Sequence, residues 1–238
     1  MSISSRWSRS IGHRGVLGTL LHLPRAVLRP LVLAVRQSRS AARAQRLPEA
    51  REPVLLHLAS GTERLKKWVN VDLYFPAELC LDLTRPLSIP DGCVDAIYSQ
   101  HFLEHISKQA AEDLIHECAR VLKPDGWLRI CTPDLETLAK LYLGKIERWE
   151  VYLQRHGEAT GRESVTPADA LNDAMRLHDH VYLHDFESLG QLFEDAGFVD
   201  IRRAQPAMSV CVHLEGRETR TTPDGIPDLD LIVEGRRP

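Results

Sequence analysis

Acidic residues are missing from the first 48 positions of this 238-residue chain, which carry nine arginines and no lysine. The remaining positions hold 21 basic and 33 acidic side chains, so the body lacks the broad basic field that binds nucleic acid. We therefore expect no nucleic-acid partner. An uninterrupted apolar run of about 18 residues is also missing, because Arg25 and Arg29 divide the stretch 16–35, and this argues against a membrane-spanning helix there.

Paired cysteines are missing as well. The five cysteines are widely spaced and form no C-x-x-C pair of the kind that indicates zinc, a redox site or a disulfide framework; they are Cys80, Cys93, Cys118, Cys131 and Cys211. This pattern is typical of a reducing compartment, so we expect a cytoplasmic protein. With 43% apolar residues, the chain can bury one substantial core.

Residues 1–50 form a basic extension with three open interpretations. In a helix, the arginines between positions 14 and 43 fall on one side and most leucines on the other. Such a helix would lie at an anionic membrane surface through residues 14–46, although Pro24 and Pro30 would interrupt it. The other two interpretations are a disordered extension and an Arg-rich transit peptide.

Residues 51–238 show alternating strand and helix patterns. Apolar residues at helical spacing predict helices at 109–122 and 186–196, and the polar stretch 146–184 reads as a helical insertion or lid. Short apolar runs predict seven strands, at 53–58, 68–72, 79–82, 94–99, 127–132, 198–204 and 230–234. This alternation predicts a single α/β domain with a Rossmann-like, doubly wound and mainly parallel sheet.

Ligands of such sheets bind at the carboxyl ends of the strands, near the point where the strand order reverses. That rule selects the loop 59–62, Asp72, Asp82, the stretch 99–105, and Pro133 with Asp134. The polar residues that interrupt the apolar strand pattern lie at these same positions.

Several motifs occur in an order that resembles class I methyltransferases. They are His57-Leu-Ala-Ser-Gly61, Asn70-Val-Asp72, Asp82-Leu83, Asp95-Ala-Ile-Tyr-Ser99 with Leu103-Glu-His105, Arg120-Val-Leu-Lys-Pro-Asp-Gly126 and Glu194-Asp-Ala-Gly-Phe198. The resemblance implies S-adenosylmethionine as cofactor and an antiparallel last strand. It implies cofactor contacts at Ala59, Ser60, Gly61, Thr62, Asp72, Leu73, Asp82, Leu83, Gln100 and His101.

Two of these residues have a clear chemical role in that interpretation. The Asp72 carboxylate would accept hydrogen bonds from the ribose hydroxyls, and the Asp82 carboxylate would accept from the adenine amino group. Ordinary capping of strand ends is the alternative for both. The glycine pattern is reduced, because Gly61 stands alone and Asp72 follows only 11 residues later, so the first crossover is expected to shrink to a turn or two of helix at 63–67. A catalytically inactive module that binds a nucleotide or a partner protein is therefore the alternative function.

Histidines supply the candidate catalytic residues, His101 and His180. His101 begins the pattern H-x-x-E-H, which also matches a zinc-peptidase motif and is close to the E-x-x-E-H metal site of some O-methyltransferases. In this chain His101 replaces the first acid of that metal site, so no metal ligands are assigned. His105 is expected to hold the loop in place through a buried hydrogen bond. His180 lies in the second histidine cluster, 178–184, and could act as a general base. The alternative is that this cluster is a polar lid whose histidines are satisfied by hydrogen bonds.

The reaction expected from these features is O-methylation of a small molecule, or of a cell-surface glycan or its lipid-linked precursor. Peripheral membrane contact through residues 14–46 would accompany the lipid-linked case.

Overall fold

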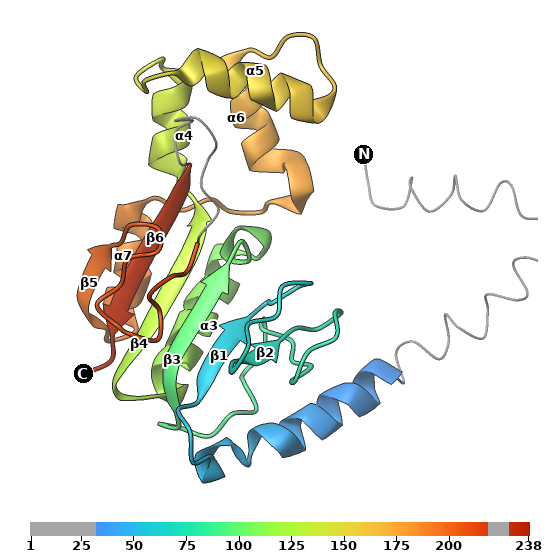
Figure 1. Ribbon diagram of the computed structural model, residues 1–238, viewed down its shortest axis with the longest axis vertical. Helices are drawn as coiled ribbons and strands as arrows, with labels where there is room; N and C mark the ends of the chain where they lie inside the picture. The colour runs from blue at the N-terminus through green and yellow to red at the C-terminus, as the bar shows by residue number, and fades with distance from the viewer. Residues whose placement is uncertain (1–31, 219–228) are drawn as a thin grey trace, which may run out of the picture.

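The structure is a computed structural model that describes residues 32–218 and 229–238. Its sheet has six strands in the order β2-β1-β3-β4-β6-β5 (Figure 1). The strands are β1 (Leu55–Leu58), β2 (Val69–Val71), β3 (Val94–Gln100), β4 (Leu122–Pro133), β5 (Val199–Arg203) and β6 (Asp230–Arg236). β1 to β4 are mutually parallel, whereas β6 is antiparallel to both β4 and β5. The predicted α/β fold with an antiparallel last strand is confirmed.

The predicted count of seven strands is wrong. Residues 79–82 form only an isolated parallel bridge, in which the Leu79 N–H donates to the Asn70 carbonyl and the Leu79 carbonyl accepts from the Asp72 N–H. Three residues later the Asp82 carboxylate accepts from the backbone N–H and hydroxyl of Thr84, which turns the chain. This local turn ends the extended segment before it can pair further.

The first crossover also differs from its prediction, because positions 63–67 contain turns and no helix. The Asn70 side chain accepts from the Leu65 N–H and donates to the carbonyls of Leu65 and Trp68. These bonds use the backbone groups that a helix would have paired. A third deviation lies in β4, which begins at Leu122, five residues before the start of the predicted strand 127–132.

Five helices lie in the described part after β3: α3 (Lys108–Val121), α4 (Leu135–Tyr142), α5 (Trp149–Thr160), α6 (Pro167–Arg176) and α7 (Phe186–Asp195). α3 and α7 cover one face of the sheet and share its main core, which includes Ile115 and Phe193. The predicted boundaries of α7 are confirmed: the Asp185 side chain accepts from the Ser188 N–H, and Gly197 follows the helix with φ +85°.

The opposite sheet face is covered in part by the segment 205–218, which contributes Cys211 and Leu214 to a core with Trp68. Arg129 of β4 fastens this segment. Its side chain is fully buried and pairs with the buried carboxylates of Glu218 and Glu234, and it donates to the carbonyls of Met208 and Gln205. These partners satisfy the buried guanidinium, so Arg129 has a structural role and holds the segment 205–218 against that face of the sheet.

The basic extension is partly described. Residues 32–44 form a helix, followed by the short 3-10 helix η1 (Leu47–Glu49). Ser40 and Ala44 are buried against the body, where the Ser40 hydroxyl accepts from the Cys80 N–H. The helix turns part of its basic side inward, because Arg36 donates to the Phe75 carbonyl. Residues 1–31, with most of the predicted membrane-binding helix, and 219–228 fall outside the described residues.

Helices α4, α5 and α6 stand beyond the end of the sheet at which β4 finishes (Figure 1). A separate small core holds them together, formed by Leu141, Leu153 and Ala170. They are followed by the 3-10 helix η3 (Leu177–Asp179) and then by α7. The stretch predicted as an insertion is thus helical and lies on the side of the sheet where the parallel strands have their carboxyl ends.

Candidate active site

The loop after β1 is built on two left-handed residues. Ala59 has φ +51° and Gly61 has φ +54°, and the buried Ser60 between them donates its N–H to the Val71 carbonyl of β2. A Cβ added at Gly61 would meet nothing within 4 Å, so backbone conformation rather than crowding explains the glycine. Strain at the non-glycine Ala59 is of the kind that clusters at ligand-binding loops.

Asp72 follows β2 and is buried, with 8% of the residue exposed. Its Oδ2 accepts from the Gly61 N–H at 2.9 Å, and its Oδ1 accepts from the N–H groups of Tyr74 and Phe75, both at 2.8 Å. A carboxylate offers about four acceptor sites, so one remains on Oδ2. Asp72 therefore joins the β1 and β2 loops and keeps room for one hydroxyl rather than two.

The remaining predicted cofactor residues lie in varied environments. Asp82 is partly exposed and carries the turn at Thr84. Leu83 is buried in the main core, which leaves its backbone as the part that a ligand could contact. Leu73 is half-buried, and Thr62 is exposed in the β1 loop. Sequence reasoning missed the exposed aromatic rings of Tyr74 and Phe75, which directly follow the Asp72 loop.

Two buried hydroxyls indicate that the strand ends suit a polar ligand. The Oγ atoms of Ser60 and Ser99 lie at the ends of β1 and β3, and neither has a hydrogen-bond partner among the described residues. Buried hydroxyls without partners are costly and mark places where a bound group completes the site. Together with the open space at Gly61 and the unused acceptor of Asp72, they fit the polar amino-acid and ribose parts of S-adenosylmethionine.

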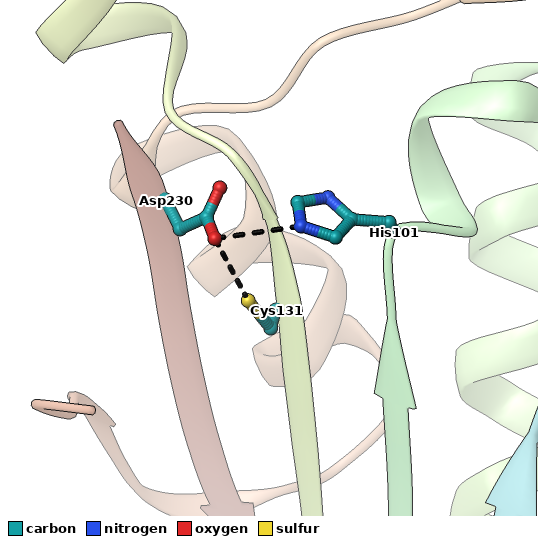
Figure 2. A group of neighbouring side chains, drawn as sticks. All are labelled: His101, Cys131 and Asp230. Atoms are coloured by element: carbon teal, nitrogen blue, oxygen red, sulfur yellow. Dashed lines mark hydrogen bonds and ion pairs between the residues drawn. The ribbon is translucent and has the colours of Figure 1, made fainter. Parts of the chain in front are cut away.

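β3 ends at Gln100, and His101, the next residue, has φ +51°. The His101 side chain is 38% exposed; its Nδ1–H donates to Glu104 Oε1 at 3.2 Å, and Nε2 lies 3.5 Å from Asp230 Oδ2. Figure 2 shows the ring reaching from the end of β3 toward Asp230 at the start of β6. Hydrogen bonds to Asp230 and Glu104 raise the pKa of His101 to about 10, which makes it a poor general base at neutral pH.

The motif H-x-x-E-H does not form the helix that a peptidase needs. Residues 103–105 are a single 3-10 turn, η2 (Leu103–His105), and His101 lies before it in left-handed backbone. Glu104 is buried and accepts from the Thr132 hydroxyl at 3.0 Å. The zinc-peptidase alternative is therefore wrong, since its two histidines must project from one face of a long helix.

His180 lies beside this turn. Its Nδ1 donates to the Ala174 carbonyl at 2.5 Å, and its ring meets that of His105 with centroids 4.9 Å apart. The Glu104 carbonyl accepts from the Val181 N–H at 2.7 Å, which ties the histidine segment to the end of β3. The hydrogen bond to Ala174 and the contact with His105 fix the orientation of the His180 ring. The side chain of His178 lies outside the description.

His184 of the same segment is fully buried, and its Nε2 has no hydrogen-bond partner among the described residues. Burial, with a smaller effect of Lys108, lowers its pKa to about 4. This histidine is therefore neutral at physiological pH and serves packing rather than proton transfer.

Two pockets in the described residues lie away from the strand ends. A pocket of about 530 Å³ lies along α5 beside Trp149 and Arg162, and another of about 360 Å³ lies between α3 and α7 beside Lys108 and Gln191. Neither includes the predicted cofactor residues. At the strand ends, the side chains of Tyr74 and His101 are exposed to solvent.

Sequence reasoning also missed Cys131 and Asp230, which the structure places beside His101. Asp230 opens a strand that was predicted, and an antiparallel strand begins at the edge where its parallel neighbours end. That rule could have placed Asp230 at the site.

The six-stranded, mainly parallel sheet with an antiparallel last strand agrees with the Rossmann-like fold of class I methyltransferases. Residues 55–130, from β1 into β4, match the family model of the methyltransferase domain. The matched segment covers about a third of the chain and indicates a methyltransferase domain, whose cofactor is S-adenosylmethionine. Among curated proteins, none matches the sequence.

Solved structures with a similar arrangement include a SAM-dependent methyltransferase from Archaeoglobus fulgidus (15% identity, 84% of this chain and 94% of that one covered, TM-score 0.46). Another is a possible histamine N-methyltransferase from Thermotoga maritima, with 15% identity, 91% of this chain and 97% of that one covered, and a TM-score of 0.48. A third is human N-acetylserotonin methyltransferase in complex with SAM, with 14% identity, 84% of this chain and 51% of that one covered, and a TM-score of 0.44. These similarities are too low to transfer a substrate or partner to this chain.

Proposed function

We propose that the enzyme methylates a hydroxyl group of a small molecule or glycan, with the cofactor held by the loops after β1, β2 and β3. When bound, S-adenosylmethionine supplies an activated methyl group, so positioning of the acceptor provides much of the rate. The chain's own task is to hold the cofactor, orient the acceptor and take up the hydroxyl proton.

Cofactor binding is assigned to Ala59, Ser60, Gly61, Thr62, Asp72, Leu73, Asp82, Leu83, Gln100 and His101. Asp72 is the centre of this assignment, because its carboxylate is buried and retains one acceptor position on Oδ2. A hydrogen bond between a charged carboxylate and a ribose hydroxyl contributes about 1.5–3 kcal/mol, or roughly a 10- to 150-fold change in affinity.

Calorimetric titration with S-adenosylhomocysteine tests this assignment. The Asp72→Ala variant should bind at least about 10-fold more weakly than wild type. Asp113→Ala, which removes an exposed carboxylate on α3, is the matched control and should bind normally. Circular dichroism at the titration temperature establishes that each sample is folded. Unchanged affinity of folded Asp72→Ala would refute the assignment.

The hydroxyl preference rests on one observation, the position of His180, whose ring lies against that of His105 beside the end of β3. Its Nδ1 is hydrogen-bonded to the Ala174 carbonyl, which fixes the ring in this place. A neutral imidazole near a hydroxyl acceptor is a general base, and general bases contribute about 10² to 10⁴ in rate. His101, engaged by Glu104 and Asp230, positions the strand-end loop and contacts the ligands rather than taking the proton.

An assay for S-adenosylhomocysteine release tests the preference for hydroxyl acceptors. It uses a panel of catechols and hexoses, each paired with its amino analogue. Hydroxyl compounds should turn over, and His180→Gln should lower kcat at least about 100-fold with little change in KM. His116→Gln, at an exposed position on α3, is the control. Turnover of the amino analogues alone, or full activity of His180→Gln, would contradict it.

We also propose that the enzyme works in the cytoplasm at an anionic membrane surface, on a cell-surface glycan or its lipid-linked precursor. Val32 and Val35 are exposed, at 55% and 44%, on the side of the docked helix that faces away from the body, and the basic segment 1–31 precedes them. Apolar residues beside arginines favour the headgroup region of anionic lipid. No helix among the described residues is long and apolar enough to cross a membrane.

Co-sedimentation with phosphatidylserine vesicles tests this localisation. The full chain should partition to the vesicles and a chain of residues 32–238 should remain largely in solution, with the difference shrinking at high salt. This truncation keeps the docked helix intact, so the comparison isolates the first 31 residues. Equal partitioning of the two chains would contradict membrane contact.

A further inference from the structure

Three chemically different metal ligands converge at the carboxyl edge of the sheet. His101 directly follows β3, Cys131 lies in β4, and Asp230 opens β6; one potential ligand atom from each lies within 4.8 Å of the others. In Figure 2 the His101 imidazole and the Cys131 thiol both point toward the same oxygen of Asp230. Three strands that are far apart in the sequence therefore supply one cluster.

The separations within this cluster suit a tetrahedral ion. His101 Nε2 lies 3.5 Å from Asp230 Oδ2, and Cys131 Sγ lies 3.7 Å from the same oxygen. Zinc binds nitrogen and oxygen at about 2.0–2.2 Å and sulfur at about 2.3 Å, which places neighbouring ligand atoms of a tetrahedron about 3.3–3.8 Å apart. These two separations fall within that range.

A second observation points the same way, because His101 has the hydrogen bond typical of a zinc ligand. Its Nδ1–H donates to Glu104 Oε1, and Glu104 is in turn fixed by the Thr132 hydroxyl. Metal-binding histidines nearly always give their second ring N–H to a carboxylate or carbonyl, which orients the ring and directs the other nitrogen at the ion. Here that other nitrogen is Nε2, the atom that faces Asp230.

We propose that His101, Cys131 and Asp230 bind a zinc-class divalent cation through Nε2, Sγ and Oδ2. The thiol and, where present, the Nε2–H give up their protons to the buffer, and the ion binds to the thiolate, the imidazole and the carboxylate without any change of oxidation state. Three protein ligands leave a fourth position for water or another oxygen ligand. Binding of the ion does not require a particular methyl acceptor.

A neighbouring group is the alternative location. Glu104, His105 and His180 also lie within 4.8 Å of one another. However, both Glu104 carboxylate oxygens already accept hydrogen bonds, from His101 and Thr132, and the residue is 1% exposed. His180 Nδ1 is committed to the Ala174 carbonyl. These hydrogen bonds occupy ligand atoms that this group would need to bind an ion.

The test uses the full chain without an affinity tag, stripped with a chelator and titrated with zinc chloride against a chromophoric chelator. We expect one zinc per chain at sub-millimolar affinity. Cys131→Ser and Asp230→Asn should each weaken binding at least about 100-fold, and Glu104→Gln about 10- to 100-fold. Cys93→Ser, at a buried cysteine outside the cluster, and His180→Ala should leave the affinity unchanged.

Cobalt substitution of the wild-type protein provides a measurement that does not depend on variants. The cobalt form should show a thiolate-to-metal charge-transfer band, and the band should be missing from Cys131→Ser. Absence of binding below millimolar zinc would overturn the proposal, as would binding without the thiolate band. Loss of zinc in His180→Ala together with retention in Cys131→Ser would place the ion in the neighbouring group and would equally overturn it.

Discussion

Acidification should destabilise the protein through His184. The imidazole is fully buried beside α7, and its pKa is lowered to about 4, mainly by burial. In the unfolded chain its pKa is about 6.5. The unfolded state therefore binds one proton more between these two values, so stability falls as pH decreases from 6.5 toward 4.

The magnitude follows from the size of the shift. Each pH unit below 6.5 costs about 1.4 kcal/mol, so His184 should remove about 2 kcal/mol between pH 7 and pH 5, and about 3 kcal/mol by pH 4. Lys108 strengthens the effect by repelling the protonated ring, whereas Asp185 and Glu104 weaken it. At neutral pH the ring contributes mainly packing, because Nε2 has no partner among the described residues.

Urea unfolding at pH 7 and pH 5 measures this effect by difference. The wild type should lose about 2 kcal/mol more than His184→Leu, a variant that keeps an apolar side chain of similar volume at the site. His116→Leu removes an exposed histidine on α3 and should lose as much as the wild type. Equal losses for wild type and His184→Leu would show that the buried ring gains its proton without penalty, and the reasoning would fail.

Three further perturbations have definite expected outcomes. Arg129→Met should cost about 3–5 kcal/mol in urea unfolding, because it leaves the Glu234 carboxylate buried without its cation; a loss under 1 kcal/mol would contradict this. Asp185→Ala should cost about 1 kcal/mol in the same assay by removing the N-cap of α7, and an unchanged midpoint would show that the cap is dispensable. A chain starting at position 52 should be less stable than one starting at 32 by at least about 1–3 kcal/mol, since the Cys80 N–H loses its acceptor; equal stability would mean that the docked helix contributes nothing.

Local patterns were sufficient to predict most of the elements. The apolar run before Ala59 and the helical spacing before Gly197 are short-range signals, and the corresponding β1 and α7 lie where they were predicted. The predictions fail where side chains compete for the backbone hydrogen bonds of a helix or strand. Asn70 binds the first crossover and prevents a helix, and the Asp82 turn stops the third strand at a single bridge.

The candidate site was only half predictable for a different reason. The β1 and β2 loops follow directly from motifs, so Gly61 and Asp72 could be named as candidates from the sequence. Asp230 reaches the same edge only because β6 pairs antiparallel with β4, a contact across about a hundred residues. A buried arginine within an apolar strand, such as Arg129, likewise becomes understandable only when its distant partners are known.

The placement of β6 between β4 and β5 has a consequence for biosynthesis. β6 supplies the central partner of two strands made earlier, so β5 has no neighbour in the sheet until β6 has been translated. His101 and Cys131 are translated long before Asp230 joins them. The edge that carries these three side chains is therefore completed only after β6 is made, and a nascent chain stalled before Asp230 should be without it.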